Sequence, residues 1–178
     1  MDESIEVGRS VVAEPYQKSL NALLMLWKGI ATFVYRHPKY THLFGPVSIS
    51  NDYSLVARQL MAETLSVHYY DEQKARLVTP STPLSQNNGS FWQSGLLSAL
   101  ASVQLLSKVL SRMEQGKGLP VLLRQYLKMN GKLVCFNVDP AFQNCLDGLI
   151  VVNLNEVPLT TLAKYMGREE AQHYLSGR

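Results

Sequence analysis

The chain has 178 residues, of which 46% are hydrophobic, 9% aromatic and 17% charged. This composition is far from the disordered class and can bury one sizeable core, so we expect a single domain over residues 1–178. The formal net charge of +3 is too small for a protein that coats nucleic acid, and we expect no nucleic-acid partner. The two cysteines, Cys135 and Cys145, predict neither a zinc site nor a disulfide framework.

The start of the chain and its apolar segments predict a cytoplasmic location. The acidic residues at the start lead into no apolar signal segment, and Leu20–Trp27 is far shorter than a bilayer-crossing helix. Residues 77–107 contain no charged side chain, but prolines, asparagines and a glycine break them up. This uncharged segment is either a loop and a helix covered by the rest of the fold, or a surface that meets lipid or acyl chains.

The first half of the chain predicts two strands, each followed by a helix. Its elements are a strand at Glu6–Val12, a helix over residues 18–34, a strand at Leu43–Ser50 and a helix that runs to about Tyr69. The second strand contains Gly45 and Pro46, a pair that is typical of an edge strand or a bulge. The second helix follows Asn51–Ser54, which offers capping residues.

The second half predicts helices and a hairpin. Its elements are a long helix at about Ser94–Glu114, a short helix at Val121–Lys128, strands at Lys132–Val138 and Leu149–Leu154, and a last helix at Leu159–Tyr165. The connection between its two strands suits an antiparallel pair. An early α/β order followed by a late hairpin predicts an α+β fold with a mixed sheet flanked by helices.

The first candidate constellation lies on the first predicted strand. Strand alternation would place Glu6, Gly8 and Ser10 on one face and Arg9 on the other. A carboxylate there could accept the proton of an attacking amine, directly or through water. A salt bridge at the end of the strand explains the same residues without any function.

Two further constellations are polar turns. Ser48, Ser50, Asn51 and Asp52 surround a strand-to-helix junction whose N–H groups could hold a phosphate or an acyl oxygen. Helix capping by Asn51, Asp52 or Ser54 explains that junction without any function and is the preferred interpretation of the residues alone. Asn137, Asp139 and Asp147 bracket the hairpin connection, where Asx turns account for them. The four histidines share no ligand spacing, and no metal site is predicted.

Several segments of the chain together resemble a known family. The segments are GRSVVAEPYQKS, LLMLWKGIATFV, LFGPVSISNDYS and GLPVLLRQYLKMNGKLVCFNVDPAFQNCLDGLIVV. They are similar to the hemolysin-like, GNAT-like N-acyltransferases, which include ornithine-lipid and glycine-lipid N-acyltransferases, and more distantly to acyl-homoserine-lactone synthases. The most specific pieces are the E-x-G-R-S strand and the block at Gly118–Gly131, GLPVLLRQYLKMNG, in which Arg124 fills the basic position. The D-P-x-F block at Asp139–Phe142 supports them.

The resemblance implies a GNAT-type fold with an acyl thioester held between the strands Glu6–Val12 and Leu43–Ser50. It implies transfer of a fatty acyl group, often 3-hydroxylated, from acyl carrier protein to the α-amine of an amino acid such as ornithine or glycine. Glu6 would deprotonate or orient the amine, and Arg9 would belong to the electrostatic network around it. The residues that would bind substrate are Ser10, Ser48, Ser50, Asn51, Asp52, Arg124, Asn137 and Asp139.

Two departures from related enzymes refine these expectations. The loop Ala13–Ser19 lacks a glycine-rich pyrophosphate cradle, which favours acyl carrier protein over coenzyme A as the donor, with no covalently bound cofactor. Basic residues that could receive the acidic carrier are Lys18, Lys28, Arg36, Lys39, Lys117, Arg124 and Lys128.

The family's domain also has strands before the E-x-G-R-S motif, so the chain resembles the C-terminal part of such a domain. A sheet without those strands has an open edge, which favours dimerisation or partner binding. The resemblance also implies peripheral contact with the inner face of the membrane. The alternative function is a non-catalytic module, the remnant of a larger acyltransferase, that binds lipid or carrier protein.

Overall fold

The structure is a computed structural model that describes residues 3–8, 10, 12–16, 19, 21–84 and 90–177. Its strands are β1 (Ser4–Glu6), β2 (His42–Ile49), β3 (Lys132–Asp139) and β4 (Cys145–Asn153). Its α-helices are α1 (Ala22–Arg36), α2 (Leu55–His68), α3 (Glu72–Ala75), α4 (Ser94–Ala99), α5 (Val103–Met113), α6 (Val121–Lys128), α7 (Leu159–Met166) and α8 (Arg168–Ser176). Short 3-10 helices lie at Glu14–Tyr16, Pro140–Phe142 and Leu154–Glu156.

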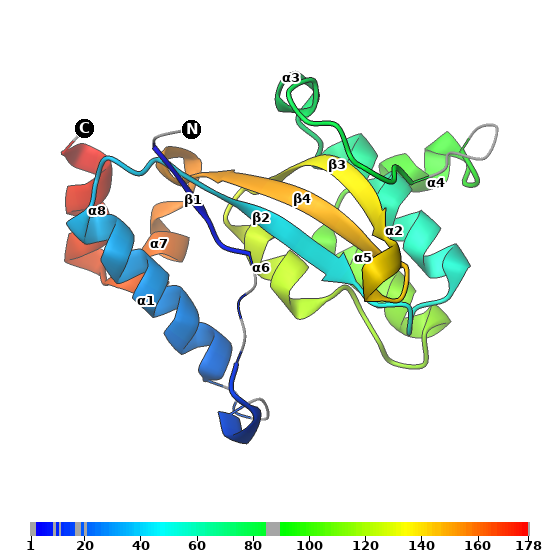
Figure 1. Cartoon of the computed structure of the whole chain (residues 1–178), viewed down its shortest axis with the longest axis horizontal. Helices are drawn as coiled ribbons and strands as arrows, with labels where there is room; N and C mark the ends of the chain where they lie inside the picture. Colours follow the sequence, from blue (N-terminus) through cyan, green and yellow to red (C-terminus); the bar gives the residue numbers. More distant parts are fainter. Residues whose placement is uncertain are drawn as a thin grey trace. The chain divides into compact units, whose positions relative to one another are not determined.

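The strands form one mixed sheet in the order β1-β2-β4-β3 (Figure 1). β1 runs parallel to β2, whereas β3 and β4 form an antiparallel pair. Helices accompany the strands throughout, so the predicted α+β class with a mixed, helix-flanked sheet is confirmed, and the arrangement is consistent with a GNAT-like fold.

The chain divides into two compact units. The first unit contains Met1–Gly45, Lys128–Asn130 and Val152–Arg178, and the second contains Pro46–Leu127 and Gly131–Val151. The strands β2 and β4 each contribute residues to both units. None of the helices among the described residues has the length and apolar character needed to span a bilayer.

In the first unit, α1 packs against α7, and α7 packs against α8. The apolar face of α1 buries Trp27, Ala31 and Val34, as the spacing of these residues predicts. The Trp27 ring lies 5.9 Å from the ring of Tyr165 on α7. These contacts form the helical core of the first unit.

In the second unit, α2 buries one face through Leu60, Met61 and Leu65, each at most 1% exposed. It packs against α4, α5 and β3. Alternate residues of β4, including Leu146 and Ile150, complete this core because successive strand side chains point to opposite faces. On the other face of β4, Cys145 is buried and the alternate residues from Asp147 on remain partly accessible.

Several details differ from the sequence predictions. The first strand covers Ser4–Glu6 rather than Glu6–Val12. The long helix predicted at Ser94–Glu114 is two helices, because Ser102 caps α5 by accepting a hydrogen bond from the Leu105 N–H. β4 begins at Cys145, four residues earlier than predicted. The helix α8, rich in polar residues, was not predicted at all.

Candidate functional site

The residues around Glu6 form a short parallel ladder. Glu6 pairs in register with Phe44 of β2, and the Val7 N–H donates to the Phe44 carbonyl at 2.8 Å. The Glu6 side chain is exposed. It can therefore meet a substrate, although β1 ends at this residue.

The pair Gly45 and Pro46 explains why the ladder stops at this point. A Cβ atom on residue 45 would lie 3.2 Å from the Gly8 nitrogen and 3.3 Å from the Val7 carbonyl carbon, so glycine permits the close approach of β1. The next residue of β2, Pro46, has no N–H to donate. Because β2 lies between β1 and β4, the pair does not mark an edge strand, and the alternative of a bulge stays a prediction.

The residues after Glu6 do not continue the strand. The Ser10 hydroxyl donates to the Val7 carbonyl at 3.3 Å, a local contact that an extended strand would not make. The expected shared strand face of Glu6, Gly8 and Ser10 is therefore wrong. Arg9, the predicted partner of Glu6, lies outside the described residues.

The junction between β2 and α2, in the second unit, is built as a helix cap. Ser54 is the N-cap of α2, and its hydroxyl accepts a hydrogen bond from the Ala57 N–H. The Asp52 N–H donates to the Ser50 hydroxyl, and the Ser54 N–H donates to the Glu114 carboxylate. Capping thus accounts for these amides, and a substrate-binding role of Ser50, Asn51 and Asp52 stays a prediction.

Basic side chains gather around the same junction. Arg58 donates to the Asn51 side chain and to the Asn144 carbonyl, and Lys117 donates to the Asp52 carbonyl at 3.4 Å. Arg124 is also close enough to change the pKa of Tyr53 electrostatically. Burial and Glu114 raise the pKa of Tyr53, and Arg124 opposes them. The structure therefore brings Asn51, Asp52 and Arg124 into one neighbourhood.

Ser48 belongs to a small polar cluster on the accessible side of the sheet. Its hydroxyl forms a hydrogen bond with the Cys145 thiol, which also donates to the Asp147 carboxylate at 3.4 Å. Burial raises the pKa of this thiol, and the carboxylates of Asp147 and Asp139 raise it further. The thiol is thus held protonated and is not an activated nucleophile.

Asn137 and Asp139 stabilise local structure. The Asn137 side-chain carbonyl accepts hydrogen bonds from the Thr82 N–H at 2.8 Å and from the Ser81 hydroxyl at 3.3 Å, which fastens that loop to β3. Asp139 accepts from the Ala141 N–H and caps the 3-10 helix Pro140–Phe142. The Asx interpretation holds for Asp139 but not for Asn137, whose partners lie far away in sequence.

A cavity of about 500 Å³ lies in the second unit between α2, β3 and the uncharged segment. Ala62 and Val67 line it from α2, and Val134 and Phe136 line it from β3. The uncharged segment adds Val78, Pro80, Pro83, Leu84, Ser90 and Leu97. None of the residues expected to bind substrate lies in this wall.

Glu63 of α2 fixes part of the wall. Its carboxylate accepts hydrogen bonds from the Phe91 N–H, the Trp92 N–H and the Ser90 hydroxyl, and also from Gln59. Burial by itself would raise the pKa of Glu63, but these hydrogen bonds outweigh it and hold the pKa below its usual value. The sequence signal was a lone carboxylate in an otherwise uncharged stretch of α2, and it was overlooked.

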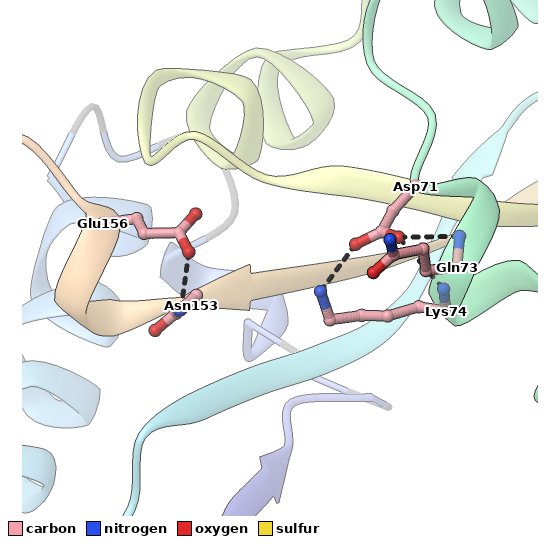
Figure 2. A network of polar contacts seen from close by, with 5 residues as sticks. All are labelled: Asp71, Gln73, Lys74, Asn153 and Glu156. Atoms are coloured by element: carbon pink, nitrogen blue, oxygen red, sulfur yellow. Dashed lines mark hydrogen bonds and ion pairs between the residues drawn. The ribbon is translucent and has the colours of Figure 1, made fainter.

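Asp71 fixes a second part of the cavity wall (Figure 2). Its carboxylate caps α3 through the N–H groups of Gln73 and Lys74 and pairs with the Lys74 ammonium at 2.5 Å. The Asp71 N–H donates to the Leu133 carbonyl of β3 at 2.9 Å. These contacts place Ala75 in the cavity wall. Figure 2 also shows Asn153, in the first unit, donating to Glu156 at 2.7 Å.

The fold is α+β, with a mixed sheet consistent with a GNAT-like fold, and a comparison with known proteins supports a relationship to acyltransferases. The chain is similar to a glycine N(alpha)-acyltransferase of Bacteroides thetaiotaomicron, with 33% identity over 90 residues. The matched region is 47% of this chain and 26% of that protein, so the similarity spans about a quarter of the relative's length. No protein-family model matches the chain. No solved structure matches it either.

Proposed function

We propose that this chain carries an N-acyltransferase activity, in which a fatty acyl group moves from a thioester to the α-amine of an amino acid such as glycine or ornithine. The observation that carries the proposal is the similarity to a glycine N(alpha)-acyltransferase. The α+β fold with its parallel pair β1 and β2 supports it. Acyl carrier protein is the donor we propose, with a lyso-aminolipid as the product.

The reaction needs one base. The amine nitrogen attacks the thioester carbonyl, a carbon–nitrogen bond forms, and the carbon–sulfur bond breaks to release the thiolate. The amine loses a proton to Glu6, directly or through water, and the thiolate takes a proton up, so the products are an amide and a thiol. The Glu6 side chain is exposed at the end of β1, so a free amine can reach it. Arg9 would belong to the charge network around it.

The carrier protein would meet basic side chains. Lys28, Arg36, Lys39 and Lys128 are exposed residues of the first unit, and Lys117 is exposed in the second. Carrier proteins are acidic, and complementary charges speed their association. We also propose that the protein contacts the membrane surface and associates with a second copy through the open edge of the sheet.

A second candidate function is a module that binds acyl chains or carrier protein without turnover. The cavity favours it, because an apolar cavity can hold a chain whether or not chemistry follows.

The test is incubation of the chain with a 3-hydroxyacyl carrier protein, or with the matching acyl-coenzyme A, and a panel of free amino acids. Intact-mass detection of an acylated amino acid, formed faster from the carrier, supports the transferase. Binding of the carrier without any product favours the binding module.

A further inference from the structure

We propose that the cavity between α2, β3 and the uncharged segment binds the hydrocarbon chain of the acyl group. This inference rests on the proposed function for the identity of its ligand. It adds the place where the acyl chain is held and the residues that line it. It also gives a reason why the described parts of the uncharged segment, residues 77–84 and 90–107, carry no charge.

The chemistry of the walls fits a hydrocarbon. Val134 of β3 is 1% exposed, Ala62 of α2 is 2% exposed and Leu97 of α4 is 5% exposed, and all three face the cavity. Glu63 is the one charged side chain among the described residues of the wall, and its carboxylate is occupied by hydrogen-bond donors from the protein. A polar ligand would find few free partners in such a space.

The size and the access of the cavity also fit. A volume of about 500 Å³ lies within the range of sites for small organic ligands. The wall residue Val67 is 54% exposed, so the cavity opens at the surface beside α2. A single flexible chain can therefore enter from solvent or from a carrier.

The walls are held in place before any ligand arrives. Glu63 fixes the segment at Ser90–Trp92, Asn137 fixes Thr82, and Asp71 fixes the start of α3 against β3. Each anchor joins the uncharged segment or α3 to a helix or strand. A preformed site of this kind avoids part of the ordering cost of binding.

Neutral acyl thioesters of N-acetylcysteamine, with chains from four to sixteen carbons, are suitable probes. Each methylene group that enters an apolar site tightens binding by about fourfold, until the site is full. We expect this rise followed by a plateau for the unaltered chain. Equal affinity for all chain lengths would overturn the inference.

The variants Val67→Trp and Val56→Trp form a matched pair. Both residues are exposed valines of α2, at 54% and 40%, but only Val67 lines the cavity. We expect Val67→Trp to weaken binding of the long probes at least tenfold and Val56→Trp to leave it unchanged. Because both sites are exposed, both variants should fold, and thermal melting checks this. Equal binding by the two variants would contradict the inference.

The two cysteines give an independent readout. Both thiols are buried, but only Cys135 lines the cavity, whereas Cys145 lies outside its wall beside Ser48. A long-chain probe should slow alkylation of Cys135 severalfold and leave that of Cys145 unchanged. Protection of neither thiol, or of both equally, would count against the site. Chain binding without acyl transfer would instead refute the proposed function and leave this inference intact.

Discussion

Two carboxylates are expected to have different roles, Glu6 in the proposed reaction and Glu63 in the stability of the fold. Glu6 is exposed at the end of its strand, whereas Glu63 accepts hydrogen bonds from three consecutive residues, Ser90–Trp92. Loss of the first should reduce turnover, and loss of the second should reduce stability.

The substitution Glu6→Gln removes the proposed base and keeps the shape of the side chain. We expect turnover to fall by about 10²-fold or more while the thermal midpoint stays the same. Glu3→Gln, three residues earlier and also exposed, is the control and should keep the full rate. Full activity of a folded Glu6→Gln protein would show that Glu6 is not the base.

The substitution Glu63→Gln tests the loop anchor through pH. The folded pKa of Glu63 lies below its ordinary value of 4.5, so the anchor stabilises the folded state fully above about pH 4.5. That stability is lost as the pH falls through the folded pKa. We expect Glu63→Gln to cost about 1 kcal/mol near pH 7 and to flatten the acid side of the stability curve. Denaturant unfolding between pH 3 and 7 measures this, with the exposed Glu72→Gln as the control. Parallel curves for Glu63→Gln and the unaltered chain would exclude the anchor.

At the scale of elements, the sequence predicts the regular helices and strands. It misses the features that depend on contacts between residues far apart in the chain. The helices α1, α2 and α6 follow from apolar spacing and caps, and the hairpin β3 and β4 follows from β-branched runs. The early end of β1 was missed, because it depends on its pairing with β2. The cavity was missed for the same reason: its walls come from α2, β3 and a loop that no local pattern joins.

Two glycine-to-alanine substitutions test whether β1 and the residues after it need to approach β2 closely at Gly45. Gly45→Ala places a Cβ atom 3.2 Å from the Gly8 nitrogen, so β1 must shift. We expect a loss of about 1–3 kcal/mol in the free energy of unfolding and a fall in turnover. Gly29→Ala in α1 meets nothing within 4 Å and should stabilise the helix by about 0.5–1 kcal/mol. Equal effects of the two substitutions, measured by urea unfolding, would refute the role of Gly45.

At the scale of the whole molecule, the chain has two compact units, and a single domain stays a prediction. The strands β2 and β4 contribute residues to both units, so unfolding of one unit would disrupt two strands of the other. We therefore expect a single calorimetric transition whose calorimetric and van't Hoff enthalpies agree. Two separate transitions would show that the units unfold independently.

The central claim is acyl transfer, and its most direct measurement follows both products in one sample. The chain is mixed with a 3-hydroxyacyl carrier protein and glycine, and the free carrier thiol and the N-acylglycine are quantified by mass over time. Transfer predicts that the two appear in equal amounts and only when the chain is present. Release of thiol without N-acylglycine, or no release at all from a carrier that binds, would contradict it.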